Sequence, residues 1–148
     1  DLADLAFVRA DTIDACLAVY SLAEVPEVAR VLRQVHRVLR KDSIFLISLP
    51  HPIAHMTAMG DDGVPTLLTP YPPAESQHWE HAGVRRESRL YPIGEMVMAL
   101  TRCNFRVDGL YEPMPSANDR DPTNGIHAHE VRGWMPETVI YRARKIGQ

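Results

Sequence analysis

Residues 26–52 join a basic amphipathic helix directly to a short apolar run, and this pairing constrains the fold more than any other feature. Pro26 suits the first turn of a helix, and Arg40 and Lys41 suit its carboxyl end. The apolar residues recur at helical spacing, so that one face carries Val28, Val31, Leu32, Val35, Val38 and Leu39. The pattern predicts a helix over residues 26–40.

Apolar runs lie on both sides of this helix. SIFLISL, residues 43–49, is typical of a buried strand. The run over residues 13–19 shows no clean alternation, which predicts a central parallel strand covered on both faces. Strand, helix and strand with short connections make a βαβ unit, whose strands are parallel and whose crossover is right-handed. We therefore expect an α/β fold built on a doubly wound sheet.

His51 leaves the carboxyl end of the second strand, between two prolines. Ligands of open α/β sheets bind at the carboxyl ends of the strands. His51 is therefore a candidate catalytic residue that would orient or deprotonate a hydroxyl nucleophile. The alternative is a turn histidine with no part in the chemistry.

Two histidine pairs have a spacing that allows metal binding, His51 with His55 and His127 with His129. Pro52 disfavours a helix that would carry the first pair, and no Cys or Glu completes a clear site. We therefore predict no metal.

The segment over residues 51–91 is expected to be irregular. Seven of the chain's twelve prolines lie between residues 50 and 92, and no hydrophobic period is sustained there. A long irregular segment in a compact domain is usually a functional loop, so we expect a lid-like insertion. Tyr71, Trp79 and Tyr91 either wall a substrate pocket or cap the core beneath this insertion.

The pattern returns to regular structure after the insertion. A helix is predicted over residues 92–103, with Asn104 as its left-handed cap. Two strands are predicted over residues 105–112 and 138–145. Only a second loop, residues 114–135, lies between them, so they should form an antiparallel pair at one edge of the sheet.

Composition places the chain among ordinary soluble proteins. The 148 residues carry a formal net charge of −3, without the basic excess that nucleic-acid binding needs. No apolar run approaches the roughly 20 residues of a membrane span. Cys16 and Cys103 lie far apart in apolar settings, which is typical of reduced thiols. We expect a cytoplasmic protein that binds neither nucleic acid nor a membrane.

In their order, these segments resemble the class I S-adenosylmethionine-dependent methyltransferases. DLADLAF is similar to the acidic stretch before the family's fourth strand, and ADTIDACLAVYSLAEV is similar to that strand. VLRQVHRVLRKDSIFLISLPHP resembles the following helix and the fifth strand, with Lys41-Asp42-Ser43 in place of the usual Pro-Gly-Gly. IGEMVMALTRCNFRVDGLYEP resembles the late helix and sixth strand, and MPETVIYRARK the antiparallel seventh strand.

This resemblance implies a Rossmann-like partial sheet, the C-terminal half of the class I methyltransferase fold, with residues 1–148 as a single incomplete domain. No Gly-x-Gly loop follows a first strand, and the chain begins without an evident start, so we expect a fragment. The family order places the strand over residues 13–19 beside the absent first strand. Its uncovered edge is expected to invite self-association.

The resemblance also implies a cofactor, S-adenosyl-L-methionine, and a partner, a small-molecule methyl acceptor. It places Asp1 and Leu2 beside the adenine. It places the methionine end of the cofactor beside Ala18, Val19 and Tyr20, for which plain core packing is the alternative. A non-catalytic remnant or interaction module that retains the half-sheet remains a second hypothesis. A different nucleotide-binding α/β enzyme, such as a reductase, has no positive support because no glycine-rich loop is present.

Overall fold

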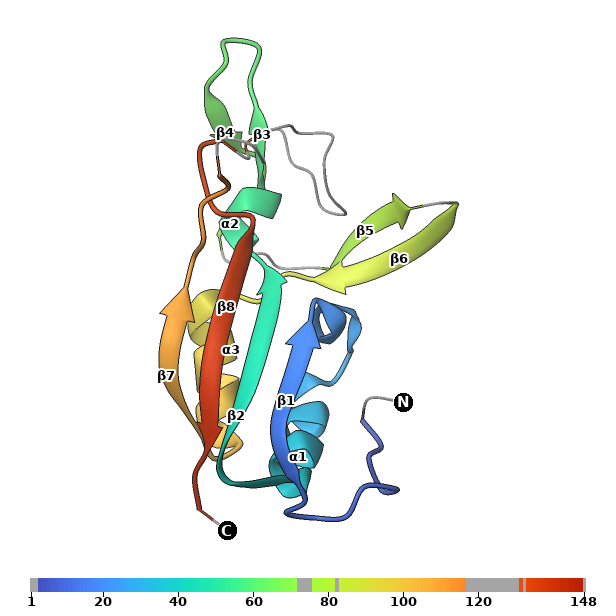
Figure 1. The fold of residues 1–148 in the computed structure, drawn as a ribbon. Helices are drawn as coiled ribbons and strands as arrows, with labels where there is room; N and C mark the ends of the chain where they lie inside the picture. The colour runs from blue at the N-terminus through green and yellow to red at the C-terminus, as the bar shows by residue number, and fades with distance from the viewer. Residues whose placement is uncertain (1–2, 72–75, 82, 117–130, 132, 148) are drawn as a thin grey trace.

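A four-stranded sheet forms the body of the protein (Figure 1). The computed structural model describes residues 3–71, 76–81, 83–116, 131 and 133–147. The strand order is β1-β2-β8-β7, and the strands are β1 (Ile13–Val19), β2 (Leu39–Pro50), β7 (Phe105–Tyr111) and β8 (Thr138–Lys145). β1 is parallel to β2, and β8 is antiparallel to both β2 and β7. The four predicted strands and their directions are therefore confirmed.

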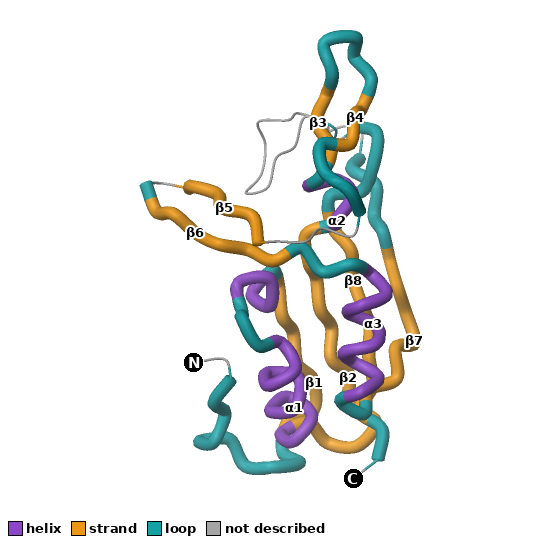
Figure 2. Tube along the Cα trace, turned by 180° about the vertical axis from the view of Figure 1, so that it is seen from behind, coloured by secondary structure: helices purple, strands orange, loops and turns teal. Residues whose placement is uncertain are grey.

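Two helices, α1 (Val28–Val38) and α3 (Ile93–Arg102), cover one face of this sheet (Figure 2). Both occupy the predicted stretches, and Asn104 has the left-handed backbone expected of the cap, with φ 60°. The first helix is shorter than predicted. It ends at Val38 because Leu39 is already extended and pairs with Ile13 of β1. None of the helices in the described ranges is long and apolar enough to cross a membrane.

The hydrophobic core fills the space between the helices and the sheet. Its largest fully buried apolar side chains include Leu32 of α1, Phe45 and Ile47 of β2, Met96 of α3 and Tyr141 of β8. On β8, alternate residues are buried, so that one face of the strand points into this core and the other does not. The core therefore holds the sheet to the helices from one side.

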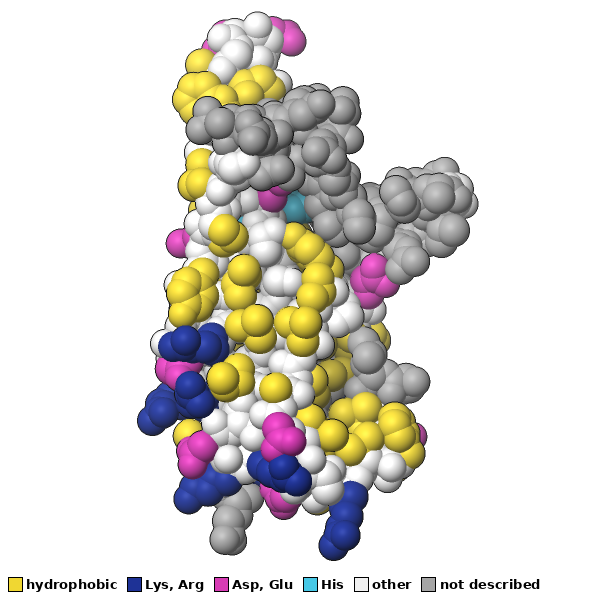
Figure 3. All heavy atoms as spheres, viewed as in Figure 1, with side chains coloured by type: hydrophobic (Ala, Val, Ile, Leu, Met, Phe, Trp, Pro, Cys, Tyr) yellow, Lys and Arg dark blue, Asp and Glu magenta, His cyan; other side chains and the backbone are white. Residues whose placement is uncertain are grey.

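The opposite face of the sheet is open, and the prediction that β1 is covered on both faces is wrong. Leu17 and Val19 of β1 are 64% and 56% exposed, whereas Ala18 between them is buried. Figure 3 shows apolar side chains gathered across this open face. Apolar residues on both sides of a strand do not reveal whether both sides are covered, so the sequence pattern was compatible with either arrangement.

The segment over residues 51–91 is more regular than predicted. It contains a short helix, α2 (Pro52–His55), and two antiparallel hairpins, β3 (Thr57–Met59) with β4 (Pro65–Leu67) and β5 (Ser76–His81) with β6 (Val84–Arg89). This helix begins after His51, so it does not carry both members of the His51/His55 pair. Pro52 occupies its first turn, where the missing N–H is not needed. The strand sequences SQHWEH and VRRESR are mostly polar, so they carried no hydrophobic period.

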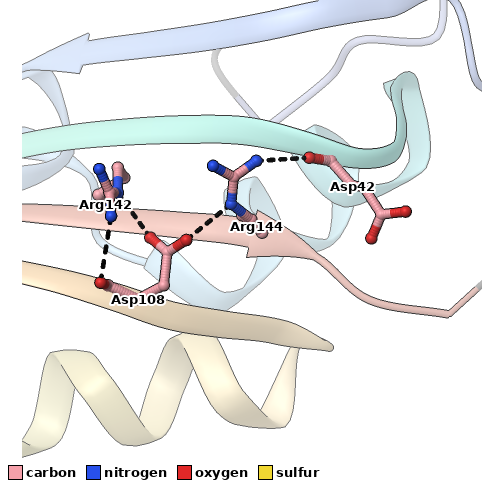
Figure 4. A network of polar contacts seen from close by, with 4 residues as sticks. All are labelled: Asp42, Asp108, Arg142 and Arg144. Carbon is pink, nitrogen blue, oxygen red and sulfur yellow. Dashed lines mark hydrogen bonds and ion pairs between the residues drawn. The ribbon is translucent and has the colours of Figure 1, made fainter.

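A charged network ties β7 to β8 on the open face (Figure 4). The carboxylate of Asp108 accepts hydrogen bonds from Arg142 Nε at 2.7 Å and from Arg144 Nε at 2.6 Å. Arg144 also donates to the backbone oxygen of Asp42, at 3.1 Å. The hydrogen bonds from Arg142 and Arg144 lower the pKa of Asp108 below its ordinary value of 3.8. The network therefore favours the ionised carboxylate in the folded protein.

Asp108→Asn is expected to destabilise the protein at neutral pH, and the difference from the wild type should shrink in acid. A folded-state pKa below the unfolded value adds stability above the unfolded pKa, and this stability is lost as the pH falls through the folded pKa. Urea unfolding at a series of pH values would measure the difference. Asp61→Asn, in an exposed turn, makes the same charge change as a control. A difference for Asp108→Asn that does not change with pH would contradict this account.

Candidate active site at the carboxyl edge of the sheet

Four strand ends meet at one edge of the sheet. β1 and β2 are parallel, so the residues that follow them, Tyr20 and His51, lie at the same edge. β8 runs the other way and begins there with Thr138. β7 is antiparallel to β8, so it ends at this edge, where Glu112 follows it. The topology thus brings polar side chains from four distant parts of the sequence together.

His51 is paired with Glu112 at this edge. His51 Nε2 lies 2.8 Å from Glu112 Oε1. The backbone N–H of His51 donates to the oxygen of Glu137 at 2.8 Å, which holds the start of α2 against the start of β8. The His51 side chain is almost fully buried, whereas the Glu112 side chain is 46% exposed. The carboxylate can therefore fix the imidazole with a proton on Nε2.

The second ring nitrogen of His51 is buried. Nδ1 has no hydrogen-bond partner within the part of the chain that the structure describes. When Nε2 donates to Glu112, Nδ1 carries a lone pair and acts as an acceptor. A histidine held in this way can take a proton from a neighbouring group. The sequence analysis selected His51 as a candidate but not Glu112, which follows a strand without any motif to distinguish it.

Tyr20 connects β1 to β8 across the end of β2. Its hydroxyl forms a hydrogen bond with the hydroxyl of Thr138, and its backbone N–H donates to the oxygen of Ser48 at 3.0 Å. Tyr20 has a left-handed backbone, with φ 54°, which is uncommon for a bulky residue. This turn leads directly into the 3-10 helix η1 (Ser21–Glu24). Strained backbone of this kind clusters at functional sites.

The other predicted cofactor residues lie beside this turn or outside the described chain. Ala18 is buried and belongs to the core cluster, whereas Val19 presents an apolar surface next to Tyr20. Contact of Ala18, Val19 and Tyr20 with a cofactor stays a prediction. Asp1 and Leu2 lie outside the described residues.

The three aromatic residues predicted to bind substrate are not equivalent. Tyr91 is buried in the core, with its hydroxyl 3.3 Å from the oxygen of Val25, which fits the core role that the sequence left open. Tyr71 is 44% exposed and accepts a hydrogen bond from the N–H of Ile93 at 3.4 Å. The backbone of Trp79 lies in β5, but its side chain falls outside the described residues.

Tyr141, which the sequence analysis did not select, adds a buried phenol to this region. Its hydroxyl has no hydrogen-bond partner in the described segments. Burial raises the pKa of Tyr141 well above its ordinary value, and the nearby charges of Tyr71 and Glu112 raise it further. Tyr141 therefore stays neutral, and it lies within electrostatic reach of the carboxylate that holds His51.

Neither histidine pair is shown to form a metal site. No group of three potential metal ligands occurs among the residues that the structure describes. His127 and His129 lie outside those residues. Both cysteines are free thiols, and burial raises the pKa of each.

Comparison with known proteins shows which folds this chain resembles. A family described as "Methyltransferase domain" matches residues 1–47. An S-adenosylmethionine-dependent methyltransferase from Mesorhizobium loti has a similar structure, with a TM-score of 0.67 and 26% identity over 98% of this chain and 67% of its own. A putative methyltransferase of the same kind from Listeria monocytogenes has a TM-score of 0.71 and 17% identity over 99% of this chain and 67% of its own.

A third similar structure contains ligands. It is the 1,6-didemethyltoxoflavin-N1-methyltransferase of Burkholderia thailandensis, with bound 1,6-didemethyltoxoflavin and S-adenosylhomocysteine. Its TM-score is 0.58 and its identity 16%, over 99% of this chain and 48% of its own. No curated protein sequence matches the chain closely enough to count as a relative.

The similar structures are longer than this chain. The chain spans about two thirds of the first two of these structures. Within that span, the strand order β1-β2-β8-β7 and the antiparallel β8 agree with the fold implied by the sequence resemblance. The chain therefore has the fold of the class I S-adenosylmethionine-dependent methyltransferases.

Proposed function

We propose that this chain is the C-terminal portion of an S-adenosylmethionine-dependent methyltransferase that acts on a small-molecule acceptor. The observation that carries the proposal is the His51–Glu112 pair at the carboxyl edge of a methyltransferase sheet. A buried imidazole with one nitrogen held by a carboxylate, and the other without a hydrogen-bond partner among the described residues, suits proton transfer better than packing. Similar structures named as methyltransferases support the reaction class.

The residues at the carboxyl edge would have three different roles: cofactor binding, proton transfer and contact with the acceptor. When bound, S-adenosylmethionine would supply an electrophilic methyl group, with its methionine end beside Ala18, Val19 and Tyr20. An acceptor atom must be held about 3–3.5 Å from that methyl group and in line with it. His51 Nδ1 takes the proton that the acceptor atom loses as its new bond to carbon forms, and Glu112 stabilises the resulting imidazolium. Tyr71, which is 44% exposed, would contribute aromatic contact to the acceptor.

Mapping the binding of S-adenosylhomocysteine by NMR tests this proposal. Added at millimolar concentration to residues 1–148, it should shift the backbone amides of Val19, Tyr20 and His51. The amide of Met98, on the exposed side of α3, serves as the control and should not shift. Shifts confined to residues away from the carboxyl edge would reject the proposed site.

A non-catalytic interaction module is the second candidate, and the open face of the sheet favours it. Leu17 and Val19 are exposed there, and β1 pairs with a strand on one side only among the described residues. A strand edge with unpaired backbone groups next to exposed apolar side chains is a template for association with another chain. This candidate would be supported if S-adenosylhomocysteine shifted no amides while the chain associated tightly with itself or with another chain.

Residues 1–148 are expected to self-associate through β1. Light scattering should give a mass above the 16.7 kDa of one chain. The double variant Leu17→Lys/Val19→Lys places two charges on the exposed face of β1 and should restore the mass of a monomer. Met98→Lys, at an exposed apolar position on α3, is the matched control and should leave the mass unchanged. A wild-type chain that remains monomeric at high concentration would contradict this expectation.

A further inference from the structure

Tyr141 and His51 each bury a polar atom that has no hydrogen-bond partner in the described segments. These atoms are the hydroxyl oxygen of Tyr141 and Nδ1 of His51. Tyr141 is fully buried, and His51 is only 3% exposed. A buried polar atom without a partner costs stability, and such atoms are uncommon in folded proteins. Each of the two atoms can therefore form a hydrogen bond to a ligand.

The strand register places both side chains on the same side of the sheet. Tyr141 of β8 pairs with Ile47 of β2 and with Leu110 of β7. Paired residues share a side of the sheet, and every second residue of a strand returns to that side. His51 lies four residues after Ile47, and Glu112 lies two residues after Leu110. Both therefore leave their strands on the side of Tyr141, where the carboxylate of Glu112 meets His51 Nε2.

The hydroxyl of Tyr141 is a hydrogen-bond donor at neutral pH. Burial raises the pKa of Tyr141 well above its ordinary value, and the nearby charges of Tyr71 and Glu112 raise it further. The hydroxyl therefore keeps its proton. Tyr71 and the side chain of Glu112 are both half-exposed, so this corner of the core borders on solvent.

His51 Nδ1 has the opposite role. Because the ring proton lies on Nε2, where it is donated to Glu112, Nδ1 offers a lone pair. A group that contacts both atoms must accept a hydrogen bond from Tyr141 and donate one to His51. A hydroxyl group and a neutral amine can each do both.

The number of lone pairs separates these two kinds of methyl acceptor. A neutral amine nitrogen has one lone pair, and a hydrogen bond from Tyr141 would occupy the pair that must attack the methyl carbon. A hydroxyl oxygen has two, so one can accept from Tyr141 while the other attacks. A phenol also gives up its proton more readily than an alkyl alcohol, which suits an imidazole base. The half-exposed ring of Tyr71 offers aromatic contact to such a ligand.

We propose that His51 and Tyr141 together recognise the hydroxyl group of a phenolic methyl acceptor. Tyr141 is the specificity-determining residue, which donates to the phenolic oxygen, and His51 Nδ1 accepts the phenolic proton. The identification of this phenol as a methyl acceptor rests on the proposed methyltransferase function. Its recognition by the two side chains does not depend on that function.

The proposed recognition fits a balanced methyl transfer. The phenolic oxygen forms a bond to the methyl carbon, the bond between this carbon and the sulfonium sulfur breaks, and the sulfur keeps the electron pair. The phenolic proton passes to His51 Nδ1, and Glu112 balances the charge of the imidazolium. The product is an ether, which has no proton left to donate to His51.

Phenol, anisole and ethylbenzene test this recognition, because they differ in the hydrogen bonds that they can form. Phenol can use both side chains, and anisole can only accept from Tyr141. Ethylbenzene has the shape of anisole and can use neither. Each compound is titrated into residues 1–148, and the backbone amides of His51 and Tyr141 are followed by NMR. Each compound is compared between variants, because the three also differ in their transfer from water.

Two variants remove the two hydrogen bonds one at a time. Tyr141→Phe should weaken the binding of phenol and anisole about three- to ten-fold, the effect of one neutral hydrogen bond, and leave ethylbenzene unchanged. His51→Gln places an amide where Nε2 was, so it can keep the contact with Glu112, but it leaves no acceptor in place of Nδ1. It should weaken phenol by a similar factor and leave anisole and ethylbenzene unchanged.

Tyr111→Phe is the matched control, because it removes the hydroxyl of a tyrosine that is 47% exposed on β7. It should leave the binding of all three compounds unchanged. Urea unfolding distinguishes a recognition role from a structural one. The hydroxyl of Tyr141 has no partner in the described segments, so Tyr141→Phe should not lower the unfolding midpoint.

Four results would overturn the inference. They are no shift of either amide by phenol up to its solubility limit, phenol binding that neither variant weakens, an equal loss for ethylbenzene, and a lower midpoint for Tyr141→Phe. The titration with S-adenosylhomocysteine separates the inference from the proposed function. If that ligand shifts Val19 and Tyr20 but phenol fails these tests, only the recognition of a phenol is rejected. If phenol passes and S-adenosylhomocysteine shifts only residues away from the carboxyl edge, the phenol site stands and its assignment to a methyl acceptor is rejected.

Discussion

Calorimetric titration of S-adenosylmethionine into residues 1–148 should give a dissociation constant in the millimolar range or weaker. The proposed site for the methionine end, at Ala18, Val19 and Tyr20, has an apolar surface and a strained turn. None of the eight glycines lies in a Gly-x-Gly sequence, and the family resemblance assigns the backbone approach to the cofactor to such a loop. Two or three missing charge-assisted hydrogen bonds, at about 1.5–3 kcal/mol each, weaken binding by several powers of ten.

Two further titrations sharpen this expectation. Tyr20→Ala removes the aromatic ring and the hydrogen bond to Thr138, and it should weaken the residual binding further. Met98→Ala, on the outer side of α3, should have no effect. Micromolar binding by residues 1–148 would show that these residues hold the cofactor in a different way, and it would require a new assignment of the site.

Lys145→Ala should lower the free energy of unfolding by about 4 kcal/mol. Lys145 is only 2% exposed, and its Nζ donates to the oxygen of Leu39 at 2.8 Å and to Asp11 Oδ1 at 2.6 Å. Truncation removes a buried stem as long as that of methionine, for which replacement by alanine costs roughly 2–5 kcal/mol. It also leaves the buried carbonyl of Leu39 without this partner, a loss of about 1–3 kcal/mol.

Urea unfolding measures this loss, and two variants separate its causes. Lys145→Met retains the apolar stem and removes the hydrogen bonds, so it should cost less than the alanine variant. Lys41→Ala replaces an exposed lysine of β2 and should change stability by less than about 0.5 kcal/mol. Similar values for Lys145→Ala and Lys41→Ala would contradict a structural role for the buried ammonium group.

The elements that the sequence predicted well are those in which apolar residues meet the core. β1 and β8 have the predicted ends, and α1 and α3 lie where their apolar faces required. In α1 and α3, burial against the core produced a helical period of apolar residues, whereas β1 was recognised as an apolar run without a period. The βαβ connection then fixed the direction of β2 relative to β1.

The features that the sequence did not predict depend on contacts between distant residues. The strands of the two hairpins pair through backbone groups. β3 and β4 have three residues each, too few for a period, and the residues of β5 and β6 are mostly polar. Glu112 becomes notable only because β7 ends beside His51. Lys145 is the last residue of β8, and its burial beside Leu39 and its hydrogen bond to Asp11 depend on residues more than 100 positions away. Contacts between residues so far apart in the sequence leave no local sequence pattern.

The central place of β8 has a consequence for the order in which the sheet can assemble during synthesis. β8 lies between β2 and β7, although it follows both of them in the sequence. A ribosome therefore releases β1, α1, β2 and β7 before the strand that joins β7 to the others exists. Until residues 138–145 emerge, β7 has no strand neighbour among the described residues, and the hydroxyl of Tyr20 lacks Thr138. The carboxyl edge is thus completed late. A nascent chain that ends before residue 138 would expose the unpaired edges of β2 and β7 to chaperones and to other chains.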